Sequence, residues 1–202
     1  MARIYESGKS LEERLDILEL KIDEPTFRQT SGKANEVNYW VFDYDPKDEM
    51  TVRAFIDRLQ NKHSEHAGYE LKVFDLYDVI VDYLESKSYI EKSAGIEEKS
   101  GLGRLVKAIQ NSLRMSNKDN FIVKHIVENT PTNSVVLLTG IGKCYPLLQA
   151  PEVFNKVLYN MPQAYMSVPM ILFYPGTYNE QELIVFDELK EDNYYRAFRI
   201  VR

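Results

Sequence analysis

The first 36 residues predict an amphipathic helix followed by a loop. In the segment SLEERLDILELKI (residues 10–22), leucine and isoleucine recur every three or four positions with charged residues between them, which is typical of a helix with one buried face. Ser10 stands directly before this periodic segment, where its side chain can cap the helix. Pro25 ends the helical pattern, and the polar stretch TSGKANE (Thr30 to Glu36) indicates a loop.

The rest of the chain alternates short apolar runs with helical patterns. Four runs rich in β-branched and aromatic residues predict strands at about Val37 to Tyr44, Tyr69 to Asp75, Ser134 to Thr139 and in VPMILFYPG (residues 168–176). Helical periodicity follows the first two runs, and strands joined through helices favour a parallel sheet. The polar stretch from Glu91 to Gly101 contains two glycines, and we expect it to be a mobile loop.

Two further strands are predicted near the C-terminus, in ELIVFDEL (residues 182–189) and NYYRAFRIV (193–201). The expected fold class is therefore α/β: a single three-layer Rossmann-like domain with a mostly parallel sheet, an N-terminal helix and a C-terminal antiparallel hairpin. We expect one domain over residues 1–202, with the helix and loop in 1–36 and the sheet-containing core in 37–202.

Composition and charge remove several classes of function. The 202 residues carry a net charge of −6, so the chain has no global electrostatic reason to coat nucleic acid. No apolar run is long enough to span a bilayer, and the first residues lack the apolar core of a secretion signal, so we expect a cytoplasmic protein. Cys144 is the only cysteine, which excludes an internal disulfide and a thiolate zinc cluster.

Carboxylates at the end of the first predicted strand are the first chemical candidates. Asp43 and Asp45 lie where ligands collect in open α/β sheets, and such a pair can hold Mg²⁺ or act on phosphorus. The pattern resembles the first motif of haloacid-dehalogenase-type phosphatases, with Thr139 matching the second motif and Asp187 with Glu188 resembling the last acidic pair. Lys47 departs from that pattern. The alternative interpretation, which we favour, is that both aspartates cap the following helix.

The segment TGIGKC (Thr139 to Cys144) is a second candidate. A P-loop requires a first glycine five residues before Gly142 and a hydroxyl side chain directly after Lys143. The chain has Leu137 and Cys144 at those positions, so ATP binding of the P-loop type is not expected. Gly140, Gly142 and Lys143 leave two interpretations open: an anion-binding nest or, as the favoured one, a tight turn after the strand.

Histidines and basic residues give weaker signals. His63 and His66 have a spacing that could begin a metal site, but the polar end of a surface helix explains them as well, and we predict no metal. Five basic residues lie between Gly101 and His125 against one acid, which is compatible with nucleic-acid binding or with a solvated helix face: Arg104, Lys107, Arg114, Lys118 and Lys124. The C-terminal segment is a candidate protein interface because tyrosine and arginine are enriched at such sites, and its candidate residues are Tyr194, Tyr195, Arg196 and Arg199.

Four segments together resemble one family over nearly the whole chain. They are NYWVFDYDPKDE (Asn38 to Glu49), LTGIGKCYPLL (Leu138 to Leu148), LFYPGTYNEQEL (Leu172 to Leu183) and NYYRAF (Asn193 to Phe198). In this order they are similar to the BrxB family of bacterial BREX systems, which defend against phage. The resemblance implies an accessory subunit without established catalytic residues, acting beside a large alkaline-phosphatase-like protein (PglZ), an ATPase, a DNA methyltransferase and a small RNA-binding-like protein.

The leading functional hypothesis is thus a non-enzymatic adaptor that binds the PglZ-type component of a BREX complex and needs no cofactor. Two alternatives from other classes stay open. One is a magnesium-dependent phosphotransferase or nucleotide-binding remnant centred on the strand-end residues Asp43, Asp45 and Thr139. The other is a nucleic-acid-binding accessory subunit that uses the basic segment. The sequence leaves the oligomeric state open.

Overall fold

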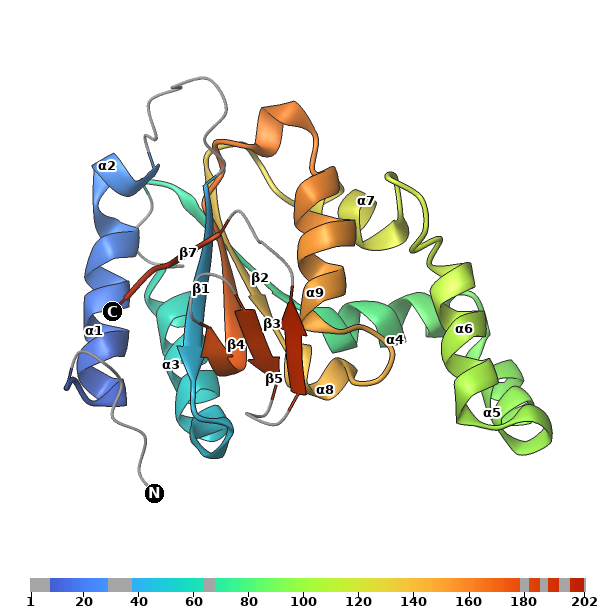
Figure 1. Ribbon diagram of the computed structural model, residues 1–202. Coiled ribbons are helices and arrows are strands. Elements are labelled where there is room, and N and C mark those ends of the chain that lie inside the picture. The colour runs from blue at the N-terminus through green and yellow to red at the C-terminus, as the bar shows by residue number, and fades with distance from the viewer. Residues whose placement is uncertain are drawn as a thin grey trace.

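Five parallel strands form the centre of the structure, a computed structural model that describes residues 8–28, 38–63, 68–178, 182–185, 189–192 and 197–201 (Figure 1). Across the sheet the order is β2-β3-β4-β1-β7. The strands span β1 (Tyr39–Tyr44), β2 (Glu70–Asp75), β3 (Ser134–Thr139), β4 (Met170–Tyr178) and β7 (Phe198–Arg199). Two short strands extend the far end of β4 in antiparallel pairing, β5 (Glu182–Val185) with β4 and β6 (Leu189–Asp192) with β5.

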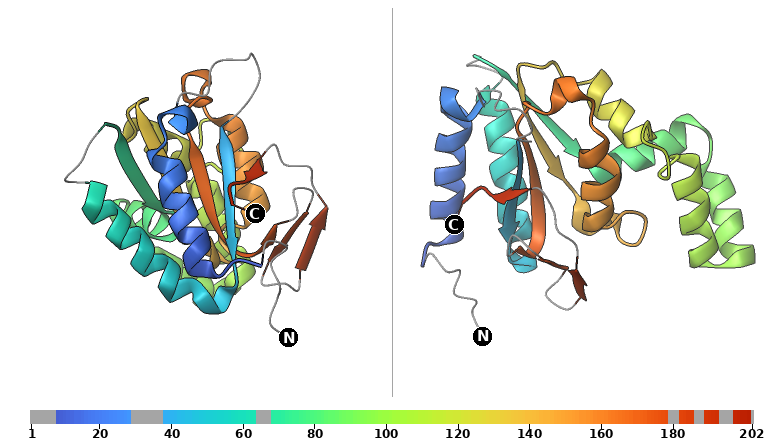
Figure 2. Two further views of the ribbon diagram at one scale, coloured as in Figure 1. Left: turned by 90° about the vertical axis from the view of Figure 1, so that its left-hand side faces the viewer. Right: turned by 45° about the horizontal axis from the view of Figure 1, so that its top comes forward.

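Helices cover both faces of this sheet, which gives the three layers that the sequence predicts (Figures 1 and 2). One face carries α1 (Leu11–Asp23), with the short α2 (Pro25–Arg28) after it, and α3 (Glu49–His63), which follows the turn η1 (Pro46–Asp48). The other face carries α4 (Leu76–Ser86), α7 (Phe121–Glu128), α8 (Ile141–Cys144) and α9 (Ala150–Glu152), which continues through η2 (Val153–Val157) and η3 (Leu158–Asn160) to η4 (Gln163–Tyr165). From this side α5 (Ile90–Ser100) and α6 (Leu102–Ser112) project away from the sheet (Figure 1).

Alternation along the strands divides the interior into two cores. In β4, Ile171 and Phe173 pack with α1 and α3, whereas Leu172 and Tyr174 pack with α4, α7 and α9. Because neighbouring side chains of a strand point to opposite faces, a strand covered by helices on both faces must be apolar throughout. This explains why the central strands are continuous hydrophobic runs in the sequence.

Local signals place the first helix and the first strand as predicted. The Ser10 hydroxyl accepts a hydrogen bond from the backbone N–H of Glu13, and the Glu13 carboxylate accepts one from the backbone N–H of Ser10, which is a capping box. The strand predicted over Val37 to Tyr44 is present as β1, with Val37 itself outside the described residues.

Two expectations need correction. The stretch Glu91 to Gly101 is not a loop but helix α5, which packs against α6. Its glutamates and lysines are good helix formers, Ile96 contacts the core, and Gly101, at φ +77°, ends the helix rather than a loop. The expected C-terminal antiparallel hairpin is not confirmed for the last predicted strand, because β7 pairs parallel with β1, and the antiparallel pairing of the described residues lies among β4, β5 and β6.

The parallel arrangement brings the carboxyl ends of β1, β2, β3 and β4 to one end of the sheet. In register, Tyr44 lies opposite Pro175, and Asp75 lies opposite Thr139. Ligands of α/β proteins bind at this end of a sheet, so the candidate residues can be examined there together. Among the described residues, no helix has the length and apolar character that crossing a membrane requires.

Candidate functional site

Asp43 is buried at the end of β1 and accepts hydrogen bonds from three donors. Its Oδ1 accepts from Nη2 of Arg14 at 2.9 Å, and its Oδ2 accepts from Nη2 of Arg199 at 2.8 Å and from the backbone N–H of Tyr178 at 3.1 Å. The Asp43 side chain has no exposed surface, and that of Arg14 is 1% exposed. Burying a carboxylate is costly unless it is paired and hydrogen-bonded, and here both conditions are met.

This ion-pair network joins distant parts of the chain. Arg14 comes from α1, Asp43 from β1 and Arg199 from β7, so the carboxylate connects the N-terminal helix to the last strand. The Arg14 guanidinium also lies 4.8 Å from the centre of the Phe42 ring. The Arg199 guanidinium donates in addition to the Tyr178 carbonyl. We call the network of Arg14, Asp43 and Arg199 the clasp, because it links α1, β1 and β7 at one side of the sheet.

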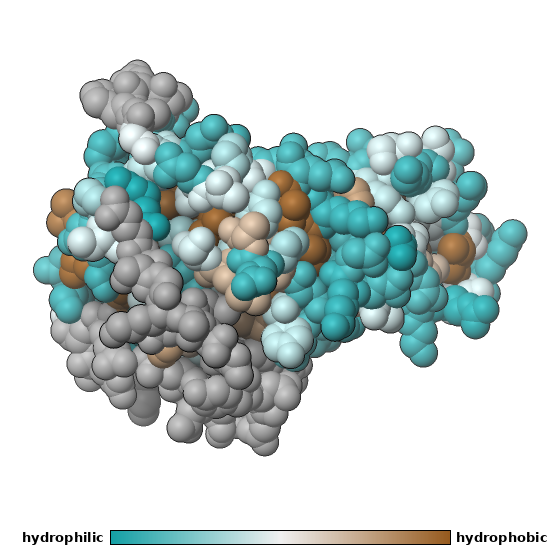
Figure 3. Space-filling model, turned by 90° about the horizontal axis from the view of Figure 1, so that it is seen from above, coloured by the Kyte–Doolittle hydropathy of each residue, from teal (hydrophilic) through white to brown (hydrophobic). Residues whose placement is uncertain are grey.

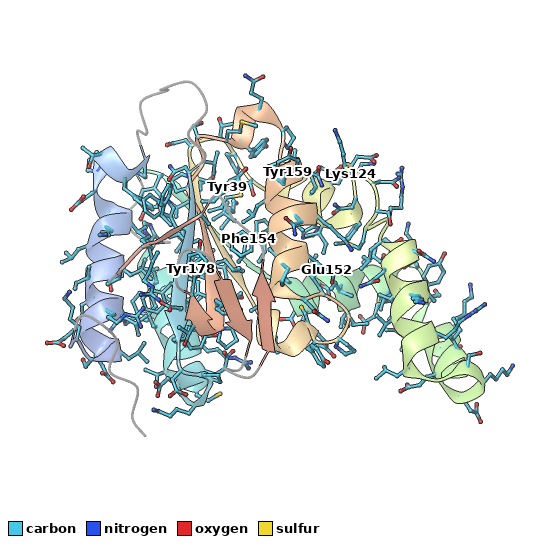
Figure 4. The ribbon with its side chains drawn as sticks, viewed as in Figure 1. Tyr39, Lys124, Glu152, Phe154, Tyr159 and Tyr178 are labelled. Atoms are coloured by element: carbon cyan, nitrogen blue, oxygen red, sulfur yellow. The ribbon has the colours of Figure 1, made fainter. Side chains whose placement is uncertain are left out.

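The clasp is reinforced by a second contact from the end of β4. Tyr178 is fully buried, and its hydroxyl, labelled in Figure 4, donates a hydrogen bond to the carbonyl of Ala197 at 2.7 Å. Its backbone N–H donates to Asp43 at the same time. Tyr178 therefore ties the end of β4 both to Asp43 and to the segment before β7.

Asp45 and Thr139, which the sequence groups with Asp43, make separate local contacts. The Asp45 carboxylate accepts from the backbone N–H of Lys47 at 3.1 Å and from its ammonium at 2.9 Å, so Asp45 caps η1 as the favoured interpretation predicts. The same interpretation is wrong for Asp43, which pairs with two arginines instead of capping the helix. The Thr139 hydroxyl donates to the carbonyl of Phe74 at 3.5 Å. The strand-end residues therefore share one end of the sheet but not one contact network.

No metal cluster is visible in the part of the chain that the structure describes, since no three His, Cys, Asp or Glu side chains there are grouped to hold an ion. Asp187, Glu188 and His66 lie outside the described residues. His63 is described, and its ring contacts the Tyr69 hydroxyl and lies 3.6 Å from the Asp23 carboxylate.

The glycine turn after β3 surrounds a carboxylate of this same chain. Gly140 has φ +74° and begins α8, which contains Gly142 and Lys143. A Cβ on Gly140 would lie 2.6 Å from Cγ of Asp75, so only glycine fits there. The Lys143 ammonium contacts Asp75 Oδ2 at 2.6 Å and Asp78 Oδ1 at 3.1 Å. The Asp75 carboxylate therefore occupies the position that an external anion would take in the predicted nest.

Asp75 is the functional candidate that the sequence reasoning missed. It ends β2 and caps α4, because its Oδ1 accepts from the backbone N–H groups of Tyr77 at 3.1 Å and Asp78 at 3.3 Å. The sequence contained a signal for Asp75. The segment YELKVFD has the pattern of a strand and ends on Asp just before a helix, and the first predicted strand has Asp43 in a similar place. In a parallel sheet, Asp75 must then lie beside Thr139 on the next strand.

A cleft of about 650 Å³ opens along β2 from this carboxylate. Helix α3 forms one wall, helices α4 and α7 form the other, and the edge of β2 lies between them. Its lining includes carboxylates from both walls together with Arg53, Lys72 and Lys143, and an apolar part that consists of Val52, Ile56, Val73, Phe74, Val79 and Phe173. Of the predicted rim, Thr139, Gly140 and Lys143 line the cleft.

Burial and nearby charges shift the pKa values of groups in and beside the cleft. Burial lowers the pKa of Lys143, but hydrogen bonds to Asp75 and Asp78 outweigh this effect and raise it above the ordinary value. Burial, followed by a hydrogen bond to Glu49, raises the pKa of Tyr44. Burial and the nearby Asp75 raise the pKa of Cys144 to about 12, so its thiol is neutral at physiological pH.

Comparison with known proteins decides the family. A sequence model of the family described as "BREX protein BrxB" matches residues 72–200. A relative of that description from Bacillus cereus (strain H3081.97) is 37% identical over 193 residues, which cover 96% of this chain and 98% of the relative. Another, from Escherichia coli O9:H4 (strain HS), is 31% identical over 192 residues, which cover 95% of this chain and 92% of the relative.

The chain belongs to the BrxB family. BrxB proteins are components of the BREX system. No solved structure matches the chain. The region that the BrxB sequence model matches begins within β2 and ends directly after β7, so it includes Asp75, Lys143 and Arg199, whereas Arg14 and Asp43 precede it.

In this BrxB chain, the described part of the predicted interface segment, residues 197–201, contains one exposed side chain, that of Phe198. Arg199 is 13% exposed and belongs to the clasp. Its neighbour Phe198 is 55% exposed, and its ring centre lies 5.9 Å from that of Trp40, which in turn lies 5.6 Å from that of Phe27. We call Phe27, Trp40 and Phe198 the aromatic row. Tyr194, Tyr195 and Arg196 lie outside the described residues.

The basic segment of this BrxB chain is distributed over α6, α7 and the turn between them. Asp119 pairs with Arg114 at 3.4 Å and with Lys124 at 3.2 Å, and the hydrogen bond from Lys124 lowers the pKa of Asp119. Arg104 and Lys107 are exposed on the projecting α6. The surface of the projecting helices is mainly hydrophilic in Figure 3. Part of the positive charge that the sequence shows is therefore neutralised within the segment.

Proposed function

We propose that this chain is a non-catalytic adaptor of a BREX anti-phage complex that binds the alkaline-phosphatase-like PglZ component through the aromatic row. The observation that carries the proposal is Phe198, an exposed aromatic side chain at the β7 edge of the sheet that packs on Trp40. Aromatic side chains supply a large part of the binding energy at protein interfaces, and a row fixed by ring contacts loses little side-chain entropy on binding.

The position of the aromatic row supports a role in binding a partner protein in addition to packing. Phe27 comes from α2, Trp40 from β1 and Phe198 from β7, so the row lies over the junction of three elements at one edge of the sheet. The segment NYYRAF, which ends at Phe198, supplies further tyrosine and arginine next to it in the sequence. Such a composition is typical of the core of an interface.

The contacts of Asp43 support an adaptor over a phosphotransferase. Both of its carboxylate oxygens accept hydrogen bonds from protein donors, so an attack on phosphorus would first require release of an oxygen from a guanidinium. Binding through a preformed aromatic surface requires no such rearrangement.

The proposal is tested by affinity purification of the tagged protein from cells that carry the whole operon, at moderate and at high salt, with and without nuclease. We expect PglZ to remain bound under all these conditions. Phe198→Ser should reduce the recovered PglZ about tenfold, the loss of about 1.4 kcal/mol expected for an interface aromatic. Binding that disappears with nuclease or high salt would instead support the nucleic-acid alternative through Arg104 and Lys107.

Tyr159→Ser is the matched control, because Tyr159, labelled in Figure 4, is an aromatic residue that is 75% exposed and lies on η3, outside the three elements that carry the aromatic row. It should leave PglZ recovery unchanged, and both variants should unfold at the temperature of the unmodified protein within about two degrees. Equal recovery with Phe198→Ser and the unmodified protein would refute the aromatic row as the interface. Absence of PglZ under every condition would refute the adaptor function.

A further inference from the structure

Strand β2 forms the edge of the sheet opposite the aromatic row. It pairs with β3 on one side, and among the described residues no strand lies on its other side. Figure 2 shows β2 at one side of the sheet and β1 near the opposite side. An open edge strand presents main-chain groups that can pair with another chain, and proteins usually block such an edge with bulges, proline or charge. In β2, Lys72 is the basic residue, and it pairs with Glu70 at 2.7 Å.

The direction of the main-chain groups of β2 follows from one hydrogen bond. The N–H of Glu70 donates to the carbonyl of Asn133 at 3.1 Å, so Glu70 faces β3. In a parallel pair the residues of a strand alternate between the two sides, and Leu71 and Val73 therefore direct their N–H and C=O groups outwards. Within the described part of the chain, neither residue makes a main-chain hydrogen bond on that side.

The outward edge of β2 opens into the cleft instead of being covered by a helix. Val73 lines the cleft, while α3 and α4 stand on either side of the strand. Apolar residues of both walls, such as Ile56 and Val79, line the same space. The cleft is therefore shaped to receive an extended chain that pairs with β2 and places alternate side chains against the two walls.

Charge indicates what kind of chain fits. The lining contains five carboxylates and three cationic groups, a net charge of −2 from Glu49, Asp57, Asp75, Asp78 and Asp82 against Arg53, Lys72 and Lys143. Arg53 pairs with Glu49, and Lys143 pairs with Asp75 and Asp78. The ion pairs of the described residues leave Asp57 on α3 and Asp82 on α4 uncompensated, one on each wall.

We infer that the β2 edge is a second binding surface, which accepts an extended segment of a partner protein with alternating apolar and basic residues as an added strand. Main-chain hydrogen bonds to Leu71 and Val73 provide affinity, and Asp57 and Asp82 select lysine or arginine. This inference is independent of the proposed binding of PglZ, because it uses the opposite edge of the sheet and other residues.

The test uses the full-length protein labelled with ¹⁵N and a short blocked peptide of alternating lysine and valine. A shift of one residue lets the lysines face either wall, so the peptide can reach Asp57 or Asp82. We expect saturable binding, at least tenfold slower exchange of the Leu71 and Val73 amide protons in the complex, and no binding of the corresponding glutamate–valine peptide. A lysine–valine peptide that is N-methylated at every amide keeps the charge but has no N–H to donate in either register, and should not bind.

Two variants with matched controls separate pairing from charge. Val73→Pro removes an outward N–H but leaves the bonds to β3, and should abolish binding. Asp57→Asn combined with Asp82→Asn should weaken binding about fivefold, as expected for the one partly exposed ion pair that the peptide makes in either register. The double variant Glu12→Gln/Asp16→Asn changes the net charge equally at exposed positions of α1 and should have no effect.

Several results would overturn the inference. Binding of the N-methylated peptide as tightly as its parent would show that charge alone attracts it, and equal binding of the glutamate peptide would exclude selection by the acidic walls. Failure of the lysine–valine peptide to bind at millimolar concentration would remove the edge as a docking surface. If the protein alone sediments as a dimer that Val73→Pro converts to a monomer, the occupant of the edge is a second copy of this chain. If Val73→Pro fails to fold, the Asp57→Asn/Asp82→Asn variant still tests the inference, because unchanged peptide binding by that variant would contradict it.

Discussion

The ends of β1 and β2 look alike in sequence and differ in structure. Each strand carries aromatic and β-branched residues and has an Asp at or beside its end, just before a helical segment. Asp43 on β1 is completely buried between two guanidinium groups, whereas the Asp75 side chain on β2 is 25% exposed, caps a helix and holds Lys143 at the mouth of a cleft. One carboxylate holds the fold together, and the other lies where a ligand can reach it.

The difference follows from the place of each strand in the sheet. Strand β1 has neighbours on both sides, and the side chains of Arg14 on α1 and Arg199 on β7 enclose Asp43, which is removed from water. Strand β2 is at the edge and has only β3 beside it among the described residues. An Asp at a strand end is therefore a poor indicator of chemistry until the strand order is known, because strand order decides whether solvent reaches it.

The largest expected effect is on Asp43. Asp43→Asn leaves two buried guanidinium groups without their counter-ion, and we expect the free energy of unfolding to fall by about 3 to 5 kcal/mol, measured by urea denaturation. Asp75→Asn removes a helix cap and a partly exposed ion pair, and should cost only about 1 to 2 kcal/mol. Equal losses for the two substitutions would contradict the distinction between the two strand ends.

A smaller loss is expected at the turn after β3. Gly140→Ala places a Cβ against the Asp75 carboxylate at a positive φ, and should cost about 1 to 3 kcal/mol. In a protein that already carries Asp75→Ala, the steric part of this loss is absent, so Gly140→Ala should cost less there. A double-mutant cycle by urea denaturation measures the coupling. Strict additivity would show that the carboxylate does not occupy the glycine turn.

The smallest expected effect is a pH dependence at the amino end of β2. Burial lowers the pKa of His63 below the value of about 6.5 that histidine has in an unfolded chain. Between these two values the unfolded state binds more protons, so stability is complete above about pH 6.5 and decreases as the pH falls towards the folded-state pKa. His63→Gln should reduce this slope in denaturation experiments from pH 5 to 8. A stability that rises on acidification through this range would contradict the burial of His63.

Local pattern was sufficient for much of the fold. Apolar runs located β1, β3 and β4, the segment YELKVFD located β2, and Ser10 located the start of α1. The prediction failed for α5, which has no buried residue and carries Gly95 in its interior, so its sequence lacks the apolar stripe that marks most helices. Its stability comes from packing against α6, which no local pattern displays.

The contacts of the strand ends could be predicted only in part. A parallel sheet placed the candidate residues at one end, as the register confirms. Arg14 gave no signal, because the sequence pattern of an amphipathic helix does not distinguish a buried arginine from an exposed one. Its partner Asp43 lies 29 residues away in the sequence. Arg199 is 156 residues from Asp43, and such long-range pairing depends on the strand order, which was not predicted.

The most direct test of the account is residue-level amide hydrogen exchange in the free protein and in the assembled complex. We predict slow exchange throughout β1 in both states, with fast exchange of the Leu71 and Val73 amides in the free protein and strong protection of them once the edge is occupied. Slow exchange of Leu71 and Val73 in the free protein, together with fast exchange of Val41 and Phe42, would contradict the division of the sheet into a closed side and an open side.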